Sequence, residues 1–320
     1  MSSLSTDLGR RLAARIDGRV KENELLASHV YYRVGGPADL FVEPSNEEDI
    51  RIAIEFARAE GLPLTVIGAG TNLLVRDGGL EGLCLYLGAG LRGEIEILQE
   101  NDDFVRVRVP SHWAKSRLLD ESLRRGWGGL EFSAGIPGTV GGAVYMNAGT
   151  KWGSYGEVIE SVRLFSSDLG FYEKSNAEMG FRYRGHGESV LRPWTVVVSA
   201  DFKLPKRLTT QIAALADEIL TYRGSKQPLE LPNCGSVFKN PPSGPGAGRL
   251  VEACGLKGLC VGGAQVSLKH ANFILNARHA TATDLETLIE KVAAAVKEQK
   301  GVELEREVII LGRRQRSDSP

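Results

Sequence analysis

Residues 135–143 read Gly-Ile-Pro-Gly-Thr-Val-Gly-Gly-Ala, and glycine fills four of these nine positions. Glycine lacks a Cβ atom, so a backbone rich in glycine can approach a flat ring or a phosphate closely. The longer stretch 133–149 is too dense in glycine to predict regular helix or strand. We therefore expect an irregular loop here that contacts an extended ligand.

A second glycine-rich segment, Gly-Ala-Gly-Thr-Asn at residues 68–72, lies earlier in the chain and follows an apolar strand predicted at residues 62–67. Successive backbone N–H groups of such a segment can form a concave nest for phosphate, and Thr71 and Asn72 add donors. The same residues also suit a structural turn that only needs positive φ angles. Two such loops in neighbouring units would grip both ends of one extended cofactor.

The segments around the glycine-rich loop at residues 68–72 predict an α/β unit. A strand with a turn at residues 35–37 is expected over residues 32–44, and Ser45 begins a capping box for a helix that ends near residue 59. Short strands are expected at residues 73–75 and 83–87.

The next segments predict a second unit with antiparallel strands. Hydrophobic residues alternate with polar residues over 94–97 and 104–109, which indicates antiparallel pairing. Ser111 is the expected cap of a helix that ends near residue 125. Strands at 158–166 and 195–204 complete this unit.

The last third of the chain predicts a third α/β unit, which an amphipathic helix over residues 209–223 separates from the second. It holds a Pro/Gly-rich loop at 241–248, a strand at 272–276, a helix that Thr283 caps together with Glu286, and a final strand at 302–311.

Residues 88–93, Gly-Ala-Gly-Leu-Arg-Gly, match the dinucleotide-binding fingerprint Gly-x-Gly-x-x-Gly. In that fold the fingerprint opens a helix, whereas the residues that follow here alternate like a strand. We therefore interpret residues 88–93 as a hairpin turn.

Composition excludes several classes of protein. The 320 residues exceed the size of one hydrophobic core, and the formal net charge of −1 provides no long-range attraction to nucleic acid or anionic membrane. The four cysteines and five histidines show no metal-ligand spacing. No secretory signal or membrane span is apparent. We expect a cytoplasmic protein without a metal, nucleic-acid or membrane partner.

Three polar segments are candidates for chemistry. Residues 235–241, Gly-Ser-Val-Phe-Lys-Asn-Pro, bring a hydroxyl, an ammonium and an amide together after Arg223 and Lys226, which suits an oxyanion or equally a turn with a solvated lysine. Arg184 ends Phe-Arg-Tyr-Arg at 181–184 and either is solvated or binds a carboxylate. The glutamates in 303–307 alternate on one face of the last predicted strand, as they also would on a solvent-facing edge.

Taken in this order, the chain from about residue 28 to residue 312 resembles the UDP-N-acetylenolpyruvoylglucosamine reductase family. Six segments carry the resemblance: Tyr-Arg-Val-Gly-Gly-Pro-Ala at 32–38, Gly-Ala-Gly-Thr-Asn-Leu-Leu-Val at 68–75, the glycines and Pro137 within 135–143, Tyr183-Arg184, residues 235–241, and Leu-Glu-Arg-Glu-Val at 304–308.

The resemblance implies a three-domain α+β protein of the p-cresol methylhydroxylase and vanillyl-alcohol oxidase superfamily. Residues 1–90 and 91–207 would be two subdomains that bind FAD, residues 208–312 a substrate-binding domain, and residues 313–320 a disordered tail. The protein would be a monomer.

Binding and catalytic residues follow from the same resemblance. FAD would be held without a covalent bond by Gly68, Ala69, Gly70, Thr71, Asn72, Leu73, Ser133, Ala134, Gly135, Pro137, Gly138, Gly141, Gly142, Ala143, Arg223 and His270. The nucleotide-sugar substrate would be bound by Tyr183, Lys226, Lys239 and Asn240. The catalytic residues would be Arg184, Ser236 and Glu307.

The implied reaction has two halves. NADPH passes a hydride to FAD, and the reduced flavin passes it to the enolpyruvyl double bond. Arg184, assisted by Glu307, would stabilise the negative charge that develops on the substrate carboxylate. Ser236 would then protonate the remaining carbon, with Lys239 or a neighbouring ammonium beside it.

Two departures from the family pattern and two alternatives remain. Only about ten residues separate Arg184 from the next predicted strand, which matches the shorter, second type of the family and leaves the residue that caps the uridine unassigned. His186 stands where many members carry a hydroxyl residue.

The alternatives are another flavin oxidoreductase of the superfamily, or a flavin- or nucleotide-binding module without catalysis.

Overall fold

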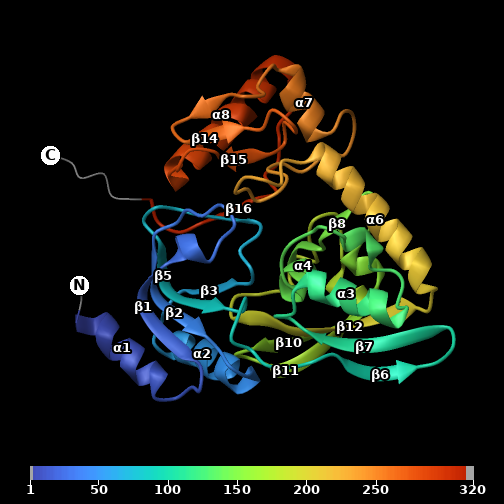
Figure 1. Cartoon of the computed structure of the whole chain (residues 1–320). Coiled ribbons are helices and arrows are strands. Elements are labelled where there is room, and N and C mark those ends of the chain that lie inside the picture. The colour runs from blue at the N-terminus through green and yellow to red at the C-terminus, as the bar shows by residue number, and fades with distance from the viewer. Residues whose placement is uncertain (1–2, 315–320) are drawn as a thin grey trace. The chain divides into compact units, whose positions relative to one another are not determined.

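The structure is a computed structural model that describes residues 3–314, shown in Figure 1. The chain forms two compact units, and each consists of segments that are far apart in the sequence. Unit 1 comprises Met1–Glu22, Leu40–Ala69 and Gly82–Arg223. Unit 2 comprises Asn23–Asp39, Gly70–Glu81 and Gly224–Pro320. The division into three domains stays a prediction.

Unit 1 holds most of a four-stranded sheet in the order β1-β2-β5-β3. Its strands are β1 (Arg19–Leu25), β2 (Pro37–Glu43), β3 (Leu64–Ile67) and β5 (Leu80–Tyr86), and β3 pairs with β5 in parallel. Helix α2 (Glu47–Ala59) and helix α1 (Ser3–Ala13) contribute apolar side chains to the same core. The core includes Leu12, Val42, Ile50, Ile54, Phe56, Leu83 and Leu85.

The cap of α2 lies one residue later than the sequence predicts. Asn46 accepts a hydrogen bond from the backbone N–H of Asp49 at 2.8 Å, so Asn46 is the N-cap. Ser45 instead donates its hydroxyl to the Asp49 carboxylate at 2.9 Å. Serine and asparagine both suit an N-cap. Asn46 is the cap here because the Ser45 hydroxyl is already hydrogen-bonded to the buried Asp49 carboxylate.

Residues 88–93 are not the hairpin turn that we expected. They connect β5 to β6 (Glu96–Glu100), which belongs to a different sheet. The rejection of the dinucleotide fingerprint is confirmed, because strand and not helix follows these glycines.

The second sheet of unit 1 has five antiparallel strands in the order β11-β10-β12-β7-β6. The strands are β6, β7 (Phe104–Pro110), β10 (Ile159–Ser166), β11 (Gly170–Ser175) and β12 (Thr195–Pro205). In β7 every second residue, Val105, Val107 and Val109, is fully buried, which confirms the antiparallel pairing predicted from the alternation. Strand β11 and the short helix α5 (Asn176–Met179) were not predicted.

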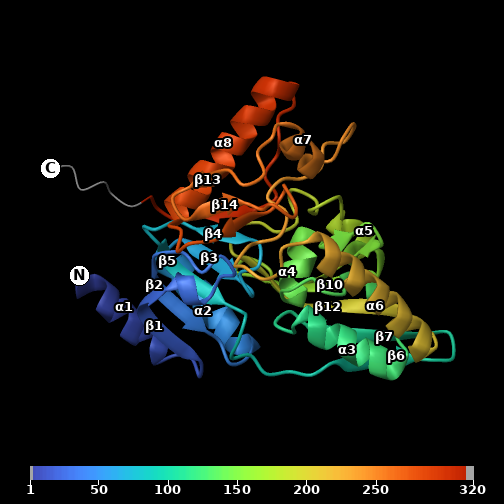
Figure 2. The same cartoon turned by 45° about the horizontal axis from the view of Figure 1, so that its top comes forward.

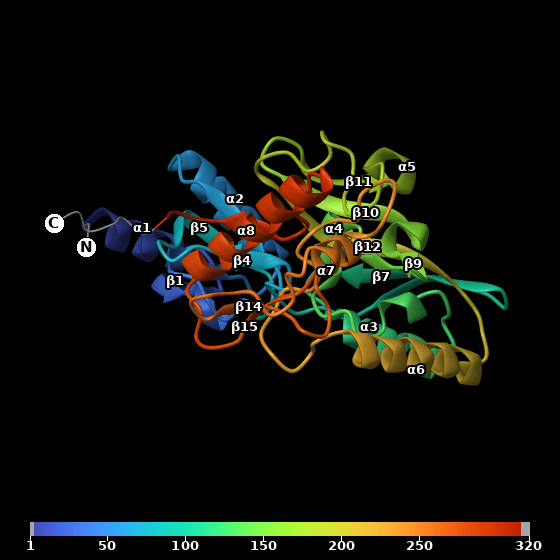
Figure 3. The same ribbon diagram turned by 90° about the horizontal axis from the view of Figure 1, so that it is seen from above.

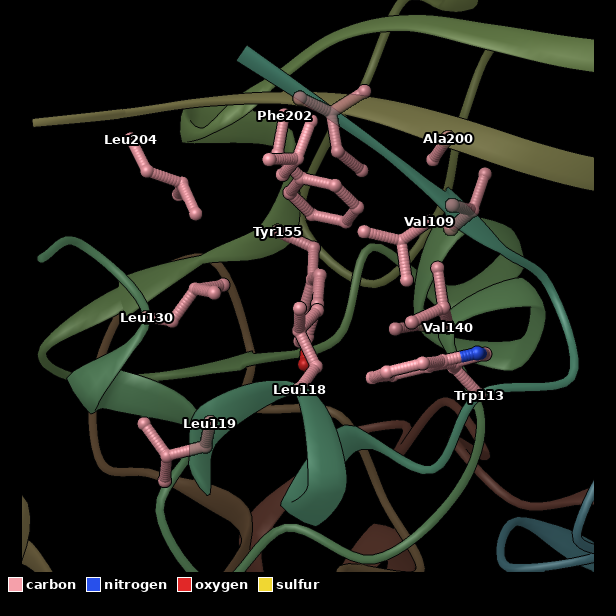
Figure 4. Packing of buried hydrophobic residues seen from close by; sticks show 14 of the residues in the cluster. Val109, Trp113, Leu118, Leu119, Leu130, Val140, Tyr155, Ala200, Phe202 and Leu204 are labelled. Atoms are coloured by element: carbon pink, nitrogen blue, oxygen red, sulfur yellow. The ribbon is translucent and has the colours of Figure 1, made fainter. Parts of the chain in front are cut away.

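Helices α3 (Lys115–Arg125), α4 (Val140–Met146) and α6 (Thr209–Lys226) share one hydrophobic core with this sheet, and α4 contacts β12 and β7 directly. Figures 2 and 3 show α3 beside the part of α6 that belongs to unit 1. Figure 4 shows the core between the sheet and these helices, where Tyr155 extends from Phe202 of β12 towards Leu118 of α3. Short 3-10 turns at Glu131–Ser133 and Tyr155–Glu157 and the hairpin of β8 (Gly149–Thr150) with β9 (Gly153–Ser154) complete this core.

The glycine-rich stretch 133–149 contains a helix, so the prediction of a wholly irregular loop was wrong. Thr139 caps α4 by accepting the Gly142 N–H at 3.3 Å, and Val140, Ala143 and Val144 are fully buried. Gly141 allows α4 to approach another segment, because a Cβ there would lie 2.9 Å from the Cβ of Ser111. Part of the glycine content therefore serves contact between protein segments.

That contact also explains why Ser111 is not the cap of α3. The carbonyl of Ser111 accepts the Gly141 N–H at 2.8 Å, and its own N–H donates to Val198 at 2.8 Å. The N-cap of α3 is Ala114, whose side chain makes no capping bond.

Unit 2 contains two small sheets and two helices. Strand β4 (Leu73–Val75) pairs in parallel with β16 (Ile309–Leu311), and β13 (Cys260–Val261), β14 (Ala264–Val266) and β15 (Ile274–Asn276) form an antiparallel sheet. Helix α8 (Ala282–Lys300) packs on that sheet and on α7 (Ala247–Ala253), which was not predicted. A 3-10 turn at Leu26–Ser28 precedes the segment that contributes Tyr32 and Val34 to the core.

The cap of α8 is two residues earlier than predicted. Thr281 and Asp284 form a reciprocal capping box. Thr283 and Glu286 have other partners, because the Thr283 hydroxyl donates to Asp77 at 2.8 Å and Glu286 forms an ion pair with Arg76 at 2.8 Å.

The long final strand predicted over 302–311 is regular only at its end. Residues 302–308 form no strand and make a single isolated bridge, between Arg306 and Phe238. The predicted tail begins at Arg313, which pairs with Asp39 at 2.8 Å, and residues 315–320 lie outside the described residues.

Candidate functional site

In unit 1 the first glycine-rich segment reaches the second. A Cβ on Gly68 would lie 2.6 Å from the Oγ1 of Thr139, the residue that caps α4. The two segments, which are about seventy residues apart in the sequence, are therefore neighbours at Gly68 and Thr139.

The rest of the first segment belongs to unit 2 and is held there by backbone contacts. Gly70 has a φ of 63°, and a Cβ would lie 2.5 Å from the carbonyl oxygen of His29, so only glycine fits. Asn72 donates its side-chain amide to the carbonyl of Glu307 at 2.9 Å. Leu73 accepts the thiol of Cys234 at 3.2 Å. These residues fix the segment, whether or not they also contact a cofactor.

The residues predicted in stretch 133–143 fall into three groups, of which the half-buried one comprises Gly138 and Gly141. Ser133, Ala134 and Ala143 are buried, and Ser133 donates its hydroxyl to Leu130 at 2.7 Å. The exposed members are Gly135, Pro137 and Gly142. At Gly142 a Cβ would meet only the Oγ1 of Thr139, at 3.5 Å, so nothing in unit 1 requires glycine there. An exposed glycine without a protein neighbour fits a backbone that approaches a ligand.

Arg223 of α6 lies against this stretch. Its Nη2 donates to the carbonyl of Gly135 at 3.1 Å, whereas its buried Nε has no hydrogen-bond partner among the described residues. Burial lowers the pKa of Arg223 below its usual value. A buried donor that faces a glycine-rich backbone fits an anionic ligand.

Lys115, the first residue of α3, is a cation that the sequence reasoning missed. It is only 5% exposed, and its N–H donates to the carbonyl of Gly138 at 2.9 Å. Burial, together with the charges of Arg223 and Arg184, lowers the pKa of its ammonium to about 7. Its spacing from the buried Leu118, Leu119 and Ser122 is i+3, i+4 and i+7, a pattern that indicates the buried face of a helix.

Arg184 lies in a tight loop of unit 1. Its φ is 54°, a conformation that a residue with a side chain rarely adopts. Backbone hydrogen bonds in both directions between Arg182 and Gly185 hold the loop, and the Nη2 of Arg184 donates to Gly149 at 2.8 Å. A strained backbone that its surroundings maintain is common at functional sites.

The neighbours of Arg184 are aromatic. The Arg184 guanidinium lies 4.9 Å from the ring centre of Tyr183, which is largely exposed. The ring of His186 packs edge-on against Tyr145 at 5.4 Å, and its Nδ1 is 2.9 Å from the carbonyl of Gly187. His186 therefore has a structural role in this loop.

In unit 2 the segments of Ser236 and Glu307 lie side by side. The N–H of Glu307 donates to the carbonyl of Val237 at 2.8 Å. Asn272 holds the Ser236 segment in place, because its side chain exchanges hydrogen bonds with the backbone of Phe238 at 3.0 and 2.8 Å. Ser236 and Glu307 are half-buried. The structure thus brings together two residues that the sequence could not show to be neighbours.

Lys239, which is predicted to lie beside Ser236, has an acidic partner in unit 2. Its ammonium forms an ion pair with Glu305 at 2.5 Å. The predicted role beside Ser236 took no account of Glu305, which belongs to the irregular segment 302–308.

Two other predicted residues of unit 2 also have structural contacts. The side-chain oxygen of Asn240 accepts the N–H of Ala247 at 3.0 Å. The Nδ1 of His270 accepts the N–H of Asn272 at 3.2 Å, and burial lowers its pKa, so the imidazole is neutral. Lys226, at the last position of α6, is exposed.

Within residues 3–314 no cluster of three or more His, Cys, Asp or Glu side chains is arranged to hold a metal ion. None of the helices in that part of the chain is both long enough and apolar enough to cross a membrane.

Two glycine-rich segments meet in a mixed α and β unit beside the buried Lys115 and the half-buried Arg223, and together with a match to an FAD-binding family they define an FAD-binding oxidoreductase. Residues 38–168 match the model of the FAD binding domain family, and residues 227–311 match that of the UDP-N-acetylenolpyruvoylglucosamine reductase, C-terminal domain. The chain belongs to the UDP-N-acetylenolpyruvoylglucosamine reductase family.

Relatives over nearly the full length support this assignment. The UDP-N-acetylenolpyruvoylglucosamine reductase of Moorella thermoacetica is 42% identical over 96% of this chain and 98% of its own length. That of Shouchella clausii is 41% identical over 92% of both chains. The crystal structure of the Thermus caldophilus enzyme superimposes with a TM-score of 0.76 at 34% identity, over 92% of this chain and all of that one.

Proposed function

We propose that the chain reduces the enolpyruvyl group of UDP-N-acetylglucosamine enolpyruvate to UDP-N-acetylmuramate, with NADPH as the hydride donor and FAD as the carrier. FAD supplies the hydride chemistry when bound. The observation that carries the proposal is the backbone hydrogen bond between Glu307 and Val237, which joins the segments of Ser236 and Glu307 in unit 2. The family assignment supports the choice of substrate.

The developing negative charge on the substrate carboxylate requires a fixed cation. We assign this role to Arg184, because its Nη2 is already held by Gly149 and its backbone by the loop 182–185, so the guanidinium needs little reorganisation. Glu307 assists as a hydrogen-bonding carboxylate.

Ser236 is the proposed proton donor to the substrate carbon. Serine is a poor acid in water, so its alkoxide must be stabilised by positive charge. Lys239 is the candidate named from the sequence, but its charge is already compensated by Glu305. Lys239, Lys226, Asn240 and Tyr183 stay proposed contacts of the nucleotide sugar.

The test is the absorption spectrum of the purified protein. A flavin spectrum that NADPH bleaches and that the enolpyruvyl substrate restores without oxygen would support the proposal. Recovery only with oxygen would indicate an oxidase of the same superfamily, and a flavin that neither reagent changes would indicate a binding module without catalysis. We further propose that the protein is cytoplasmic and acts as a monomer, which size-exclusion chromatography at micromolar concentration tests.

A further inference from the structure

The buried ammonium of Lys115 has no counter-charge in the described chain. Only 5% of the residue is exposed, and no hydrogen bond or ion pair joins its Nζ to another group in residues 3–314. Its nearest aromatic contact is weak, since Nζ lies 6.0 Å from the ring centre of Tyr155. A buried cation without a partner is costly, so such a group is paired, binds a ligand or loses its proton.

The surroundings of Lys115 are positive. Arg223 and Arg184 come from two other segments of unit 1, and both act on Lys115 by charge repulsion. Of the two acidic residues of α3, Asp120 is exposed and Glu121 forms ion pairs with Arg124 and Arg125. Tyr155, the remaining titratable neighbour, has a pKa raised by burial and stays neutral.

Lys115 also lies beside the glycine-rich stretch. The residues before it pair with that stretch, through a bridge between Ala114 and Thr139 and the bond from Lys115 N–H to Gly138. On the other side, the unpartnered Nε of Arg223 would lie 3.1 Å from a Cβ on Gly135. The buried ammonium of Lys115 and the half-buried guanidinium of Arg223 therefore flank residues 135–138, a backbone suited to close approach by an anion.

We propose that Lys115 is an anion-binding residue that takes up a proton when an oxyanion binds beside residues 135–142, so that this binding weakens as the pH rises. The oxyanion is either the diphosphate of FAD or the carboxylate of the substrate. The first possibility rests only on FAD binding, whereas the second rests on the proposed function.

The direction in which the Kd changes with pH follows from the difference in proton binding between the free and the anion-bound protein. Without the anion Lys115 is half deprotonated near pH 7, and a bound anion raises its pKa. Between these two pKa values binding consumes a proton, so the Kd rises by up to about tenfold per pH unit. Well below pH 7 the ammonium is already charged and the Kd is flat. His112, whose pKa is lowered by burial, titrates below this window.

The first measurement is the Kd of FAD between pH 6.5 and 9, from equilibrium dilution of the holoenzyme and the recovery of flavin fluorescence. The second is the Kd of the enolpyruvyl nucleotide sugar on the oxidised holoenzyme, compared with UDP-N-acetylglucosamine, which lacks the carboxylate. Heats of binding in two buffers of different ionisation enthalpy count the protons taken up.

Lys115→Met and Lys115→Arg are the informative variants. Methionine should weaken binding at pH 6.5 and abolish the rise of the Kd with pH, while arginine, which stays charged, should keep tight binding at pH 9. Lys151→Met is the matched control, because that lysine also lies over aromatic rings, at 3.9 Å from Tyr222, but is exposed. It should behave as the parent protein does.

The Kd measurements with FAD and with the enolpyruvyl nucleotide sugar distinguish the two possible anions. A Lys115-dependent slope for FAD assigns the diphosphate, and a slope for the enolpyruvyl ligand alone assigns the carboxylate. Parallel pH profiles in the parent protein and in folded Lys115→Met, for both ligands, would overturn the proposal. If the protein does not turn over the substrate, the proposed function fails while the FAD measurement still tests Lys115.

Discussion

At the scale of single residues, Ser236 gives the sharpest test of the proposed chemistry. Ser236→Ala should keep FAD and its reduction by NADPH, because hydride transfer into the flavin needs no donor to the substrate carbon. Reoxidation by the enolpyruvyl substrate should slow by about 10²- to 10⁴-fold, the usual effect of losing one positioned proton donor.

Ser236→Cys is the companion variant and should recover part of the rate, because a thiol offers a proton from nearly the same position. Stopped-flow absorbance of each half-reaction separately is the measurement. Equal slowing of both halves, or unchanged reoxidation, would remove Ser236 from this role.

Gly142 tests where the cofactor approaches the protein. Gly142→Val should fold normally, since a Cβ there meets only Thr139 at ordinary contact distance, but the purified protein should lack FAD. Gly141→Val is less informative, because its side chain would collide with Ser111 and perturb unit 1 directly.

The flavin content of Gly142→Val is measured as the ratio of flavin absorbance to protein absorbance, and circular dichroism is the control for folding. A fully loaded, folded Gly142→Val protein would contradict the placement of FAD at this exposed backbone.

At the scale of elements, helix caps carry measurable stability. Thr281→Ala removes the side-chain acceptor for Asp284 N–H at the start of α8 and should lower the free energy of unfolding by about 1 kcal/mol. Urea denaturation of the full chain measures this. Thr283→Ala is the comparison, and an equal loss there would show that the bond to Asp77 matters as much as the cap.

The elements also show how far sequence reasoning reaches. Strands with clear alternation, such as β7, and helices with strong periodicity, such as α2, were predicted nearly to their ends. Short elements were missed, because α4 contains two glycines and forms through the Thr139 cap and contacts with distant segments. Propensity within a window does not contain those contacts.

The site was predictable to a similar degree. The glycine-rich segments and Ser236 carry local patterns, and the resemblance added their roles. The partners did not follow from the sequence: Glu305 beside Lys239, Ser111 behind Gly141, and Glu307 bonded to Asn72 all depend on pairings between distant segments. Lys115 was overlooked because a single lysine at a helix start is usually solvated.

At the scale of the whole molecule, the flavin should be released intact by acid or heat. The two glycine-rich segments 68–72 and 133–143 contain no histidine, cysteine or tyrosine side chain for a covalent tether. After precipitation with acid, the yellow colour and FAD fluorescence should remain in the supernatant. Colour that stays with the precipitated protein would contradict this expectation.

The pairing of β16 with β4 has a consequence for how the chain is made. Three hydrogen-bonded residues near the C-terminus complete a sheet whose other strand, Leu73–Val75, leaves the ribosome more than two hundred residues earlier. Unit 2 also includes residues 23–39 and 70–81, which contribute to its core. During most of translation these residues therefore lack the partners with which they pack. Unit 1 has all its segments once residue 223 has emerged and is free to fold during synthesis, whereas unit 2 folds only after residue 311 has emerged.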